Sequence, residues 1–490
     1  MNNKLYLLFI TASISSPHVD HISRSWFNPR SISFNSTLNQ ANTLYNWIWN
    51  NQDLDYTISI RPFAQNSTNP HSLADYFSSR ETEFETLRYD GSGYVNPGWF
   101  TLTDNANQLL STYSSNVSFA PKRQTFGFIL DFKKRFECNE CMWVRINTAL
   151  VYSKNNINLC EKNRTTEGVL DLPPIIKNAC DGFSKPMSNS KMQCCSVKKT
   201  GLDDIILRLG YDIYTTNKRI VAGWASITIP TRGNSDSVNL FSPVVGSKSF
   251  GLGAGMHWSQ LVCEKGCRKV AAIGQADIRY MLESKQQRNF DLTENGNWSR
   301  YLIFAHKTTG PNLNAARQPI PGGSLLNLDT KVTPGLEFNW LSLLHFQHAN
   351  WAFEIGFNAW WRQAECVKLD TSACENKCND KDFTDWGILD VQTWINSSGA
   401  TLKSSSKANI SQSFATVATN ADTTFTTIKA SDLNPCSVAH PATESYTIYA
   451  STQYTHCDHT YINLGFAYEF QQNRNALQQY TFFMGLERRF

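Results

Sequence analysis

Large apolar side chains alternate with small or polar ones along most of this chain, and this two-residue period limits the fold more than any other feature. Successive side chains of a β-strand point to opposite faces of the sheet, so the alternation predicts strands rather than helices. Twelve such segments begin near residues 125, 142, 203, 219, 248, 268, 298, 334, 350, 445, 459 and 477, and residues 56–63 form a candidate thirteenth. In the clearest segment, residues 249–259, glycines on one face oppose Phe250, Leu252, Ala254, Met256 and Trp258 on the other.

The composition of the two faces separates a membrane protein from a soluble one. No run approaches the ~20 apolar residues of a membrane-spanning helix, which excludes a helical membrane protein. One face of each segment is nearly all apolar, with aromatic residues near its ends, and the other is small, glycine-rich or singly charged. Tilted membrane strands of roughly ten alternating residues have this pattern, with lipid outside and water inside. We therefore expect an all-β fold: a closed antiparallel transmembrane β-barrel of about 12 strands, with 14 as the alternative because bacterial barrels have even counts.

The remaining segments suggest a domain organisation. Residues 1–15 combine Lys4, a short apolar run and small residues, which indicates a signal peptide, with a buried first strand as the alternative. Residues 16–124 form an N-terminal segment that could hold a first strand and, within 64–124, a plug or cap for the barrel. Residues 125–490 are expected to form the barrel, interrupted by a long exposed loop at 363–444.

Thirteen cysteines support export, because disulfides persist outside the cytosol. Many lie at or beyond the ends of the predicted strands, such as Cys138 and Cys141, or Cys263 and Cys267. Disulfides within loops, free thiols and a metal site remain open, although no second pair completes the zinc-like spacing of Cys138 and Cys141. Loop disulfides fit the positions best.

The chain ends in YTFFMGLERRF, again with a two-residue period. This ending resembles the last strand of bacterial outer-membrane barrels, which very often finishes on an aromatic residue that serves the insertion machinery. Gly485 and Phe490 match that assembly signal, whereas Arg488 stands where an apolar residue is usual. The resemblance implies the barrel-insertion machinery as a partner.

A second resemblance covers residues 201–258. GLDDIILRLGYDIY, WASITIPTRG and FGLGAGMHW together resemble a block found in long-chain fatty-acid transport porins and in the porins of phenol-degradation pathways. In that block the Pro-Thr pair is followed directly by glycine, but here Arg232 separates Thr231 from Gly233. The whole chain also resembles uncharacterised barrel proteins of host-associated bacteria. These resemblances imply the barrel fold and a bacterial outer-membrane location.

Motifs for chemistry are absent or weak. We find no nucleophile elbow, no His-Glu-x-x-His helix and no phosphate-binding glycine loop. The cluster His456, Cys457, Asp458 and His459 could hold a metal or a nucleophile, but its place between two strands favours an exposed turn. We expect no enzymatic activity, no cofactor and no metal site, and the dispersed charges indicate no nucleic-acid partner.

Two functional classes remain for a protein embedded in outer-membrane lipid. The first is a channel or uptake porin for small solutes, hydrophobic ones included, with these inward-facing candidates for pore lining: Arg145, Asn147, Arg208, Asp212, Glu354, Asn358, Arg362 and Glu469. The alternative is a surface-exposed interaction protein, whose barrel only anchors and presents the long loops. A lipid hydrolase is a more distant third.

Overall fold

A computed structural model describes residues 22–490 except 42, 50–55, 79–83, 89–91, 101–113, 137–138, 166–177, 234–236, 308–318, 371–382, 391–402, 458 and 473–474. The predicted signal peptide lies outside the described residues. So do Cys138, two cysteines of the 363–444 segment and Asp458 of the histidine cluster. None of the described helices is long and apolar enough to cross a membrane.

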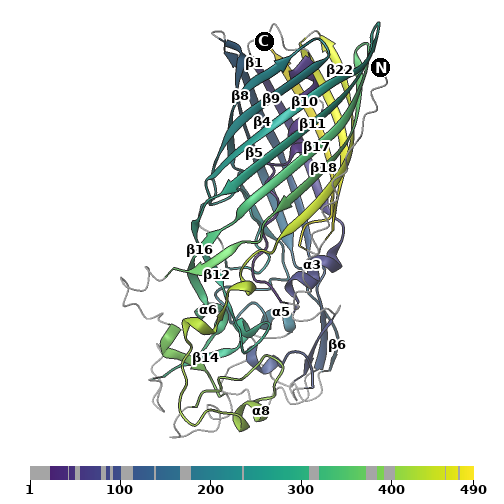
Figure 1. Ribbon diagram of the computed structural model, residues 1–490. Helices are drawn as coiled ribbons and strands as arrows, with labels where there is room; N and C mark the ends of the chain where they lie inside the picture. Colours follow the sequence, from purple (N-terminus) through teal and green to yellow (C-terminus); the bar gives the residue numbers. More distant parts are fainter. Residues whose placement is uncertain are drawn as a thin grey trace, which may run out of the picture.

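Twelve antiparallel strands form a closed barrel (Figure 1). Each strand pairs with two neighbours, and the ring closes because β1 pairs with both β24 and β4, and β4 with β5. The strands are β1 (Tyr56–Ser67), β4 (Lys122–Phe136), β5 (Asn139–Asn156), β8 (Ile205–Thr215), β9 (Arg219–Ile229), β10 (Gly251–Lys265), β11 (Arg268–Met281), β17 (Gly335–His348), β18 (Trp351–Arg362), β22 (Thr443–Cys457), β23 (Thr460–Gln471) and β24 (Gln479–Arg489). A further strand, β7 (Val197–Leu202), extends the wall beside β5.

The predicted count of 12 barrel strands is confirmed, but one of the twelve predicted segments is not a barrel strand and the candidate thirteenth segment is one instead. The candidate thirteenth segment is a barrel strand, β1, whereas the segment near residue 298 is not. There, Ser299–Tyr301 forms a 3-10 helix and Ile303–His306 forms β14, in a separate small sheet outside the barrel. Trp298 and residues 301–305 are all buried. This continuous burial is typical of a core segment, whereas a barrel strand alternates between its two faces.

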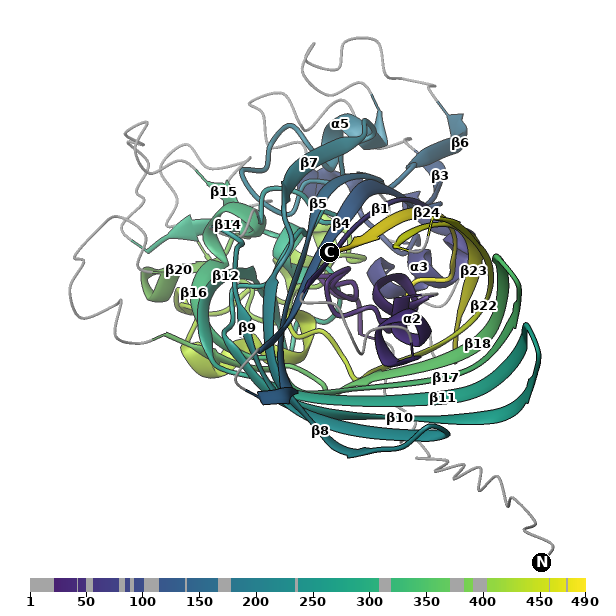
Figure 2. The same cartoon turned by 90° about the horizontal axis from the view of Figure 1, so that it is seen from above.

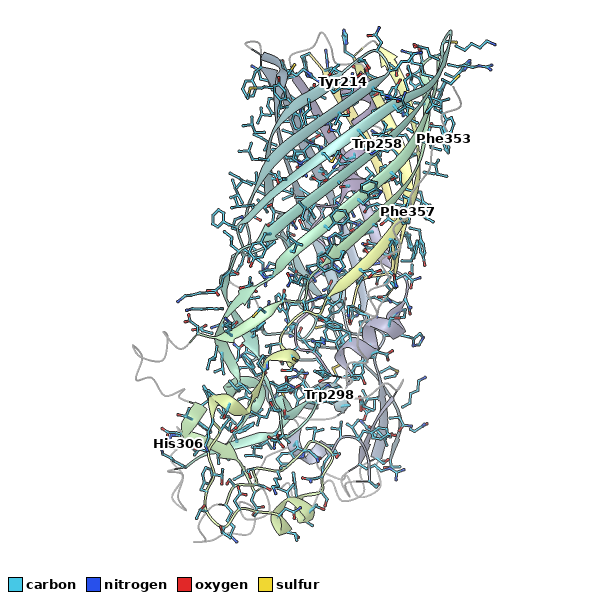
Figure 3. All side chains as sticks on the ribbon, viewed as in Figure 1. Tyr214, Trp258, Trp298, His306, Phe353 and Phe357 are labelled. Carbon is cyan, nitrogen blue, oxygen red and sulfur yellow. A yellow bond between two sulfur atoms is a disulfide. The ribbon has the colours of Figure 1, made fainter. Side chains whose placement is uncertain are left out.

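The alternation places apolar side chains on the outside of the ring. On β18, Phe353 is 47% exposed, whereas the next residue, Glu354, is completely buried. Figure 3 shows the labelled Phe353 and Phe357 on the outer wall. Large apolar residues are exposed in the same way on the other barrel strands, including Phe128, Leu252 and Leu464. A closed ring with an apolar outer band and a polar interior is the architecture of outer-membrane barrels, so this protein is an integral β-barrel of the bacterial outer membrane.

The two ends of the barrel differ. At one end, only two or three residues separate β4 from β5, β8 from β9, β10 from β11, β17 from β18, and β22 from β23. At the other end the connections are long, and they include residues 68–121, 157–204, 282–334 and 363–442. Bacterial barrels have short periplasmic turns and longer extracellular loops. The long connections therefore lie on the outer side of the membrane.

The described parts of these connections fold together into an outer domain below the barrel in Figure 1. Its core packs residues from all of them, including Phe77, Phe183, Trp298, Leu389 and Phe414. Its helices and strands are short: α3 (Pro70–Phe77), β2 (Phe84–Arg88), η1 (Pro97–Phe100), β3 (Ser114–Ser118), β6 (Cys160–Thr165), α5 (Ala179–Gly182), β12 (Ser284–Asn289), β13 (Asp291–Leu292), η2 (Ser299–Tyr301), β14 (Ile303–His306), β15 (Ile320–Pro321), α6 (Gly322–Leu325), β16 (Asn327–Thr333), β19 (Cys366–Leu369), η5 (Phe383–Asp385), β20 (Trp386–Ile388), α8 (Phe414–Thr419), η6 (Ala430–Asp432), β21 (Leu433–Asn434) and η7 (Pro435–Ser437).

Among the cysteines that the structure describes, Cys180 and Cys194 form a disulfide that links two parts of the 157–204 connection. The disulfide lies in the outer domain, as expected for a loop disulfide. Among the described residues, Cys263 and Cys267 are free although they flank a tight turn.

Phe490 lies at the seam where β24 meets β1. Its backbone N–H donates to the carbonyl of Tyr56 (3.1 Å), and the two rings stack with centroids 4.8 Å apart. The guanidinium of Arg488 lies over the Phe490 ring at 5.1 Å, which gives this unexpected arginine a packing role. Gly485 faces the interior, where an added Cβ would lie 2.6 Å from Asn463 Oδ1. The role of Gly485 and Phe490 in assembly stays a prediction.

Extending the chain beyond Phe490 separates recognition from packing. A short polar tail leaves every contact of Phe490 in place, so a packing role predicts normal assembly, whereas recognition of the chain end predicts a loss. We expect the tailed protein to yield less folded, heat-modifiable barrel in outer membranes, yet to refold normally in detergent. The control carries the same insertion after Gly266, in a turn at the same end of the barrel with open space around it. Full assembly of the tailed chain would leave packing as the only role of Phe490.

Candidate functional site

A segment preceding the first strand fills the barrel lumen. We call residues 22–49 the plug segment; it contains α1 (Ser36–Gln40) and α2 (Thr43–Trp49), and Figure 2 shows α2 inside the ring of strands. The segment starts in the outer domain, where the N–H of Ser25 donates to the carbonyl of Ser437 (2.8 Å). It ends near the short-turn end, where β1 begins. Residues 64–124 were expected to contain a plug or cap, and described residues of this range, including Phe77, Trp99 and Val117, pack in the core of the outer domain. A plug or cap role for this range stays a prediction.

The plug segment folds through local capping. Asn35 caps α1 by accepting from the N–H of Leu38 (3.3 Å). The side-chain amide of Asn39 donates to three carbonyls of the preceding turn, those of Ile32, Ser33 and Asn35. A five-residue helix leaves most of its carbonyls without a partner inside the helix. These carbonyls are buried and need donors from elsewhere.

The barrel wall supplies these donors. Arg145 of β5 donates to the carbonyl of Asn39 (3.0 Å), and Arg61 of β1 donates to those of Leu38 and Ala41. Further toward the outer end, Asn147 donates to the carbonyl of Ser33 (2.9 Å), and Asn339 donates to that of Phe34 (2.9 Å). Inward-facing polar side chains of the wall thus bind the backbone of the plug segment.

Several charged groups on the wall are buried in pairs. Arg145 binds Asp131 (2.7 Å), and Arg279 binds Glu337 (2.9 Å). Nearer the short-turn end of the lumen, His345 lies 2.9 Å from Glu354, and the ring of Tyr45 from the plug segment stacks on the imidazole with centroids 3.6 Å apart. Buried charges are tolerated only when they are paired and hydrogen-bonded, so these contacts stabilise the filled lumen.

Asp203 holds the plug segment at the outer mouth of the lumen. Its carboxylate accepts from the hydroxyl of Ser31 (2.8 Å) and from the N–H groups of Ser33 (2.6 Å) and Gly246 (3.0 Å). A polar cavity of about 40 Å³ lies beside it, lined in part by Arg30, Arg123, Asp204, Arg279 and Glu337. Sequence analysis missed Asp203 as a functional residue. The only available signal was the Asp-Asp pair at the start of the 201–258 block.

A second polar network joins the plug segment, the barrel and the outer domain; we call it the neck network. Arg362, at the end of β18, donates to the carbonyl of Asn28 (2.8 Å) and to Nδ1 of His440 (2.7 Å). Glu365 accepts from the amide of Asn28 (3.2 Å), the guanidinium of Arg288 (3.3 Å) and the N–H of His440 (3.0 Å). Burial, and then the Arg362 cation, hold the pKa of His440 well below its usual value.

The eight candidates for pore lining all face the interior and are all buried: Arg145, Asn147, Arg208, Asp212, Glu354, Asn358, Arg362 and Glu469. Of these, Arg145, Asn147 and Arg362 bond directly to the plug segment, and Glu469 lies 3.9 Å from its Arg30. Their role as pore lining stays a prediction.

The other four candidates bind other wall residues. Arg208 donates to Asn147 (2.6 Å), and Asn358 donates to Asn339 (2.5 Å). Asp212 pairs with Arg135 (2.6 Å), and Glu354 pairs with His345. The alternation therefore identified the inward face of each strand, but not the segment that fills the space between those faces.

Comparison with known proteins identifies no family. No protein-family model matches the chain, and no curated protein matches it. The chain is similar to a solved outer membrane channel from Pseudomonas putida F1, with a TM-score of 0.37 and 8% identity over 89% of this chain and 96% of that chain. It is also similar to a deletion mutant of the TodX monoaromatic hydrocarbon channel (TM-score 0.34, 6% identity, 89% of this chain and 91% of that chain).

The β domain of the Bordetella autotransporter BrkA is similar at the same level (TM-score 0.33, 6% identity, 89% of this chain and 100% of that chain). Scores this low support no functional assignment. The outer-membrane barrel is established by the closed ring of paired strands and its apolar outer face.

The neck network predicts acid sensitivity. The pKa of His440 is lower in the folded protein than the ~6.5 of a free histidine, so neutral His440 adds to the free energy of unfolding. This added stability is fully present above about pH 6.5 and is lost as the pH falls below that value. We expect the thermal midpoint, followed by tryptophan fluorescence in detergent, to fall from pH 7 to pH 5 less steeply in His440→Gln than in the wild type. One proton can contribute at most about 1.4 kcal/mol per pH unit. Exposed His348→Gln serves as the control, and an unchanged slope in His440→Gln would refute the assignment.

Proposed function

We propose that the protein is an outer-membrane channel for small solutes, and that the plug segment keeps it closed. This proposal rests on one observation: the lumen is filled by a segment that is not part of the barrel wall. A barrel that serves only as an anchor can fill its interior with its own wall side chains. Here a separate segment occupies the space, bound to the wall through backbone carbonyls that Arg61, Arg145, Asn147 and Asn339 contact.

The chemistry of the wall supports a water-filled path once the plug segment moves. The wall binds the plug segment through polar donors such as Arg61 and Arg145, and water can replace the plug's carbonyls as partner to the same donors. Apolar wall residues, including Phe63, Trp143 and Leu341, also pack in one buried cluster with apolar residues of the plug segment. Inward-facing charges of both signs would then set the field inside the pore. A path lined by polar and apolar side chains suits small hydrophobic solutes as well as small polar ones.

The outer domain favours the second candidate, a surface-exposed interaction protein. It has its own hydrophobic core and a disulfide, which is more structure than short gating loops require. Folded loops on the outer side of a membrane present a surface to external partners. The conductance of a variant without the plug segment tests the first proposal, because a lumen that stays blocked after the plug segment is removed cannot belong to a channel.

Conductance in planar lipid bilayers tests the channel proposal. We expect the wild type to conduct poorly, and a variant lacking residues 22–49 to conduct at least about tenfold better, because the deletion empties a polar lumen. The deletion also removes Trp26 and Phe27, which are buried at the outer end of the segment. The matched control is therefore Trp26→Ala with Phe27→Ala, which loses these contacts but keeps the plug.

Folding of each variant is verified by strand content and heat-modifiable migration. A folded deletion variant that conducts no better than the wild type would exclude the channel and leave the interaction protein. Equal conductance of the deletion variant and the Trp26/Phe27 control would show that damage to the outer domain opens the pore, and would refute the role given to the plug segment.

A further inference from the structure

The outer edge of the lipid-facing band is well defined on β4, β5 and β7. Across these strands, Phe128 lies opposite Leu150, which lies opposite Leu202, and all three side chains are exposed on the outer wall. In the next row toward the outer side, Phe126 lies opposite Tyr152, with ring centroids 6.4 Å apart, and Tyr152 lies opposite Thr200. Aromatic rings of this kind mark the boundary between lipid tails and headgroups.

Lysines occupy the rows directly beyond this aromatic pair. Lys154 lies opposite Lys198, one row beyond Tyr152, and Lys122 follows one row further on β4. Lys122 and Lys198 are exposed and Lys154 is partly exposed. Because the strands are antiparallel neighbours, the Cβ atoms of Lys154 and Lys198 lie ~5 Å apart. Like charges at such positions destabilise a sheet, so the arrangement calls for an anionic partner.

No carboxylate among the described residues pairs with these lysines within 4.0 Å. Another pair of lysines on the outer side, Lys285 and Lys331, also lie opposite each other on adjacent strands, but both have a carboxylate partner. They bind Asp370, at 2.8 and 3.6 Å. The strand segments around the three lysines, residues 119–124, 152–159 and 196–202, contain no Asp or Glu at all. Their positive charge is therefore uncompensated by the neighbouring strands.

We propose that Lys122, Lys154 and Lys198 bind the phosphate groups of a lipid in the outer leaflet. The three lysines lie at headgroup depth, directly beyond the aromatic pair. A lysine ammonium binds phosphate as a compact charge with three donors, and two ammonium groups from adjacent strands can reach one phosphate. The tails of the same lipid would cover Phe126, Phe128 and Leu150, which lie toward the middle of the membrane. This site is on the outer wall and does not depend on the channel proposal.

Binding of lipid A in micelles of an uncharged detergent tests the site. We expect the wild-type protein to bind diphosphoryl lipid A more tightly than lipid A from which both phosphates have been removed. Replacing all three lysines by glutamine should weaken binding of the diphosphoryl form by on the order of 100-fold, at about fivefold per lysine, and should leave binding of the dephosphorylated form unchanged. The matched control replaces Lys134, Lys218 and Lys265, near the opposite end of the barrel, by glutamine.

Three results would overturn the proposal. The first is equal binding of the two lipid forms by the wild type. The second is an equal loss in the control variant, which would indicate a general effect of net charge. The third is displacement of the lipid by inorganic phosphate at the same concentration, which would indicate a site for free phosphate instead. All variants should keep heat-modifiable migration, because the replaced side chains lie on the outer surface.

Discussion

Hydrogen bonding of the backbone in a medium without water determines this structure. An unpaired N–H or C=O group in hydrocarbon costs several kcal/mol, so a sheet in the membrane must close on itself. Here β1 completes the closure, because it pairs along its length with both β24 and β4. At the end of the contact between β1 and β24, the rings of Phe490 and Tyr56 stack on each other. Closure encloses an interior whose inward-facing side chains are mostly polar, and the rest of the molecule follows from the way this interior is filled.

The position of β1 determines the path of the plug segment. β1 starts at the short-turn end and residues 23–25 are bound in the outer domain, and the described residues between them are bound by inward-facing side chains of the wall. Its short helices leave carbonyls unpaired, and arginines and asparagines of the wall pair with them. The same segment contacts the outer domain through Asn28 and the mouth of the barrel through Ser31 and Ser33. The plug segment therefore couples the three parts of the structure.

The sequence predicted what depends on a local period. The inward and outward faces of the strands, the strand count and the inward orientation of residues such as Glu354 and Asn358 all follow from alternation in the lipid-facing wall. Residues 298–306 were misassigned because an apolar run can belong to a globular core as well as to a strand, and periodicity does not separate the two. The plug segment and Asp203 were missed for a different reason. Their role comes from hydrogen bonds between residues more than a hundred positions apart, which leave no periodic pattern in either segment.

The most direct test of the filled lumen is photo-crosslinking from the plug segment in intact outer membranes. A photoreactive phenylalanine in place of Tyr45, whose ring stacks on His345, should crosslink within the same chain. Mass spectrometry should then find the linked peptide around His345 on β17 or Glu354 on β18. Crosslinks only to lipid, to other proteins or to the outer domain would contradict the central claim that residues 22–49 occupy the barrel interior.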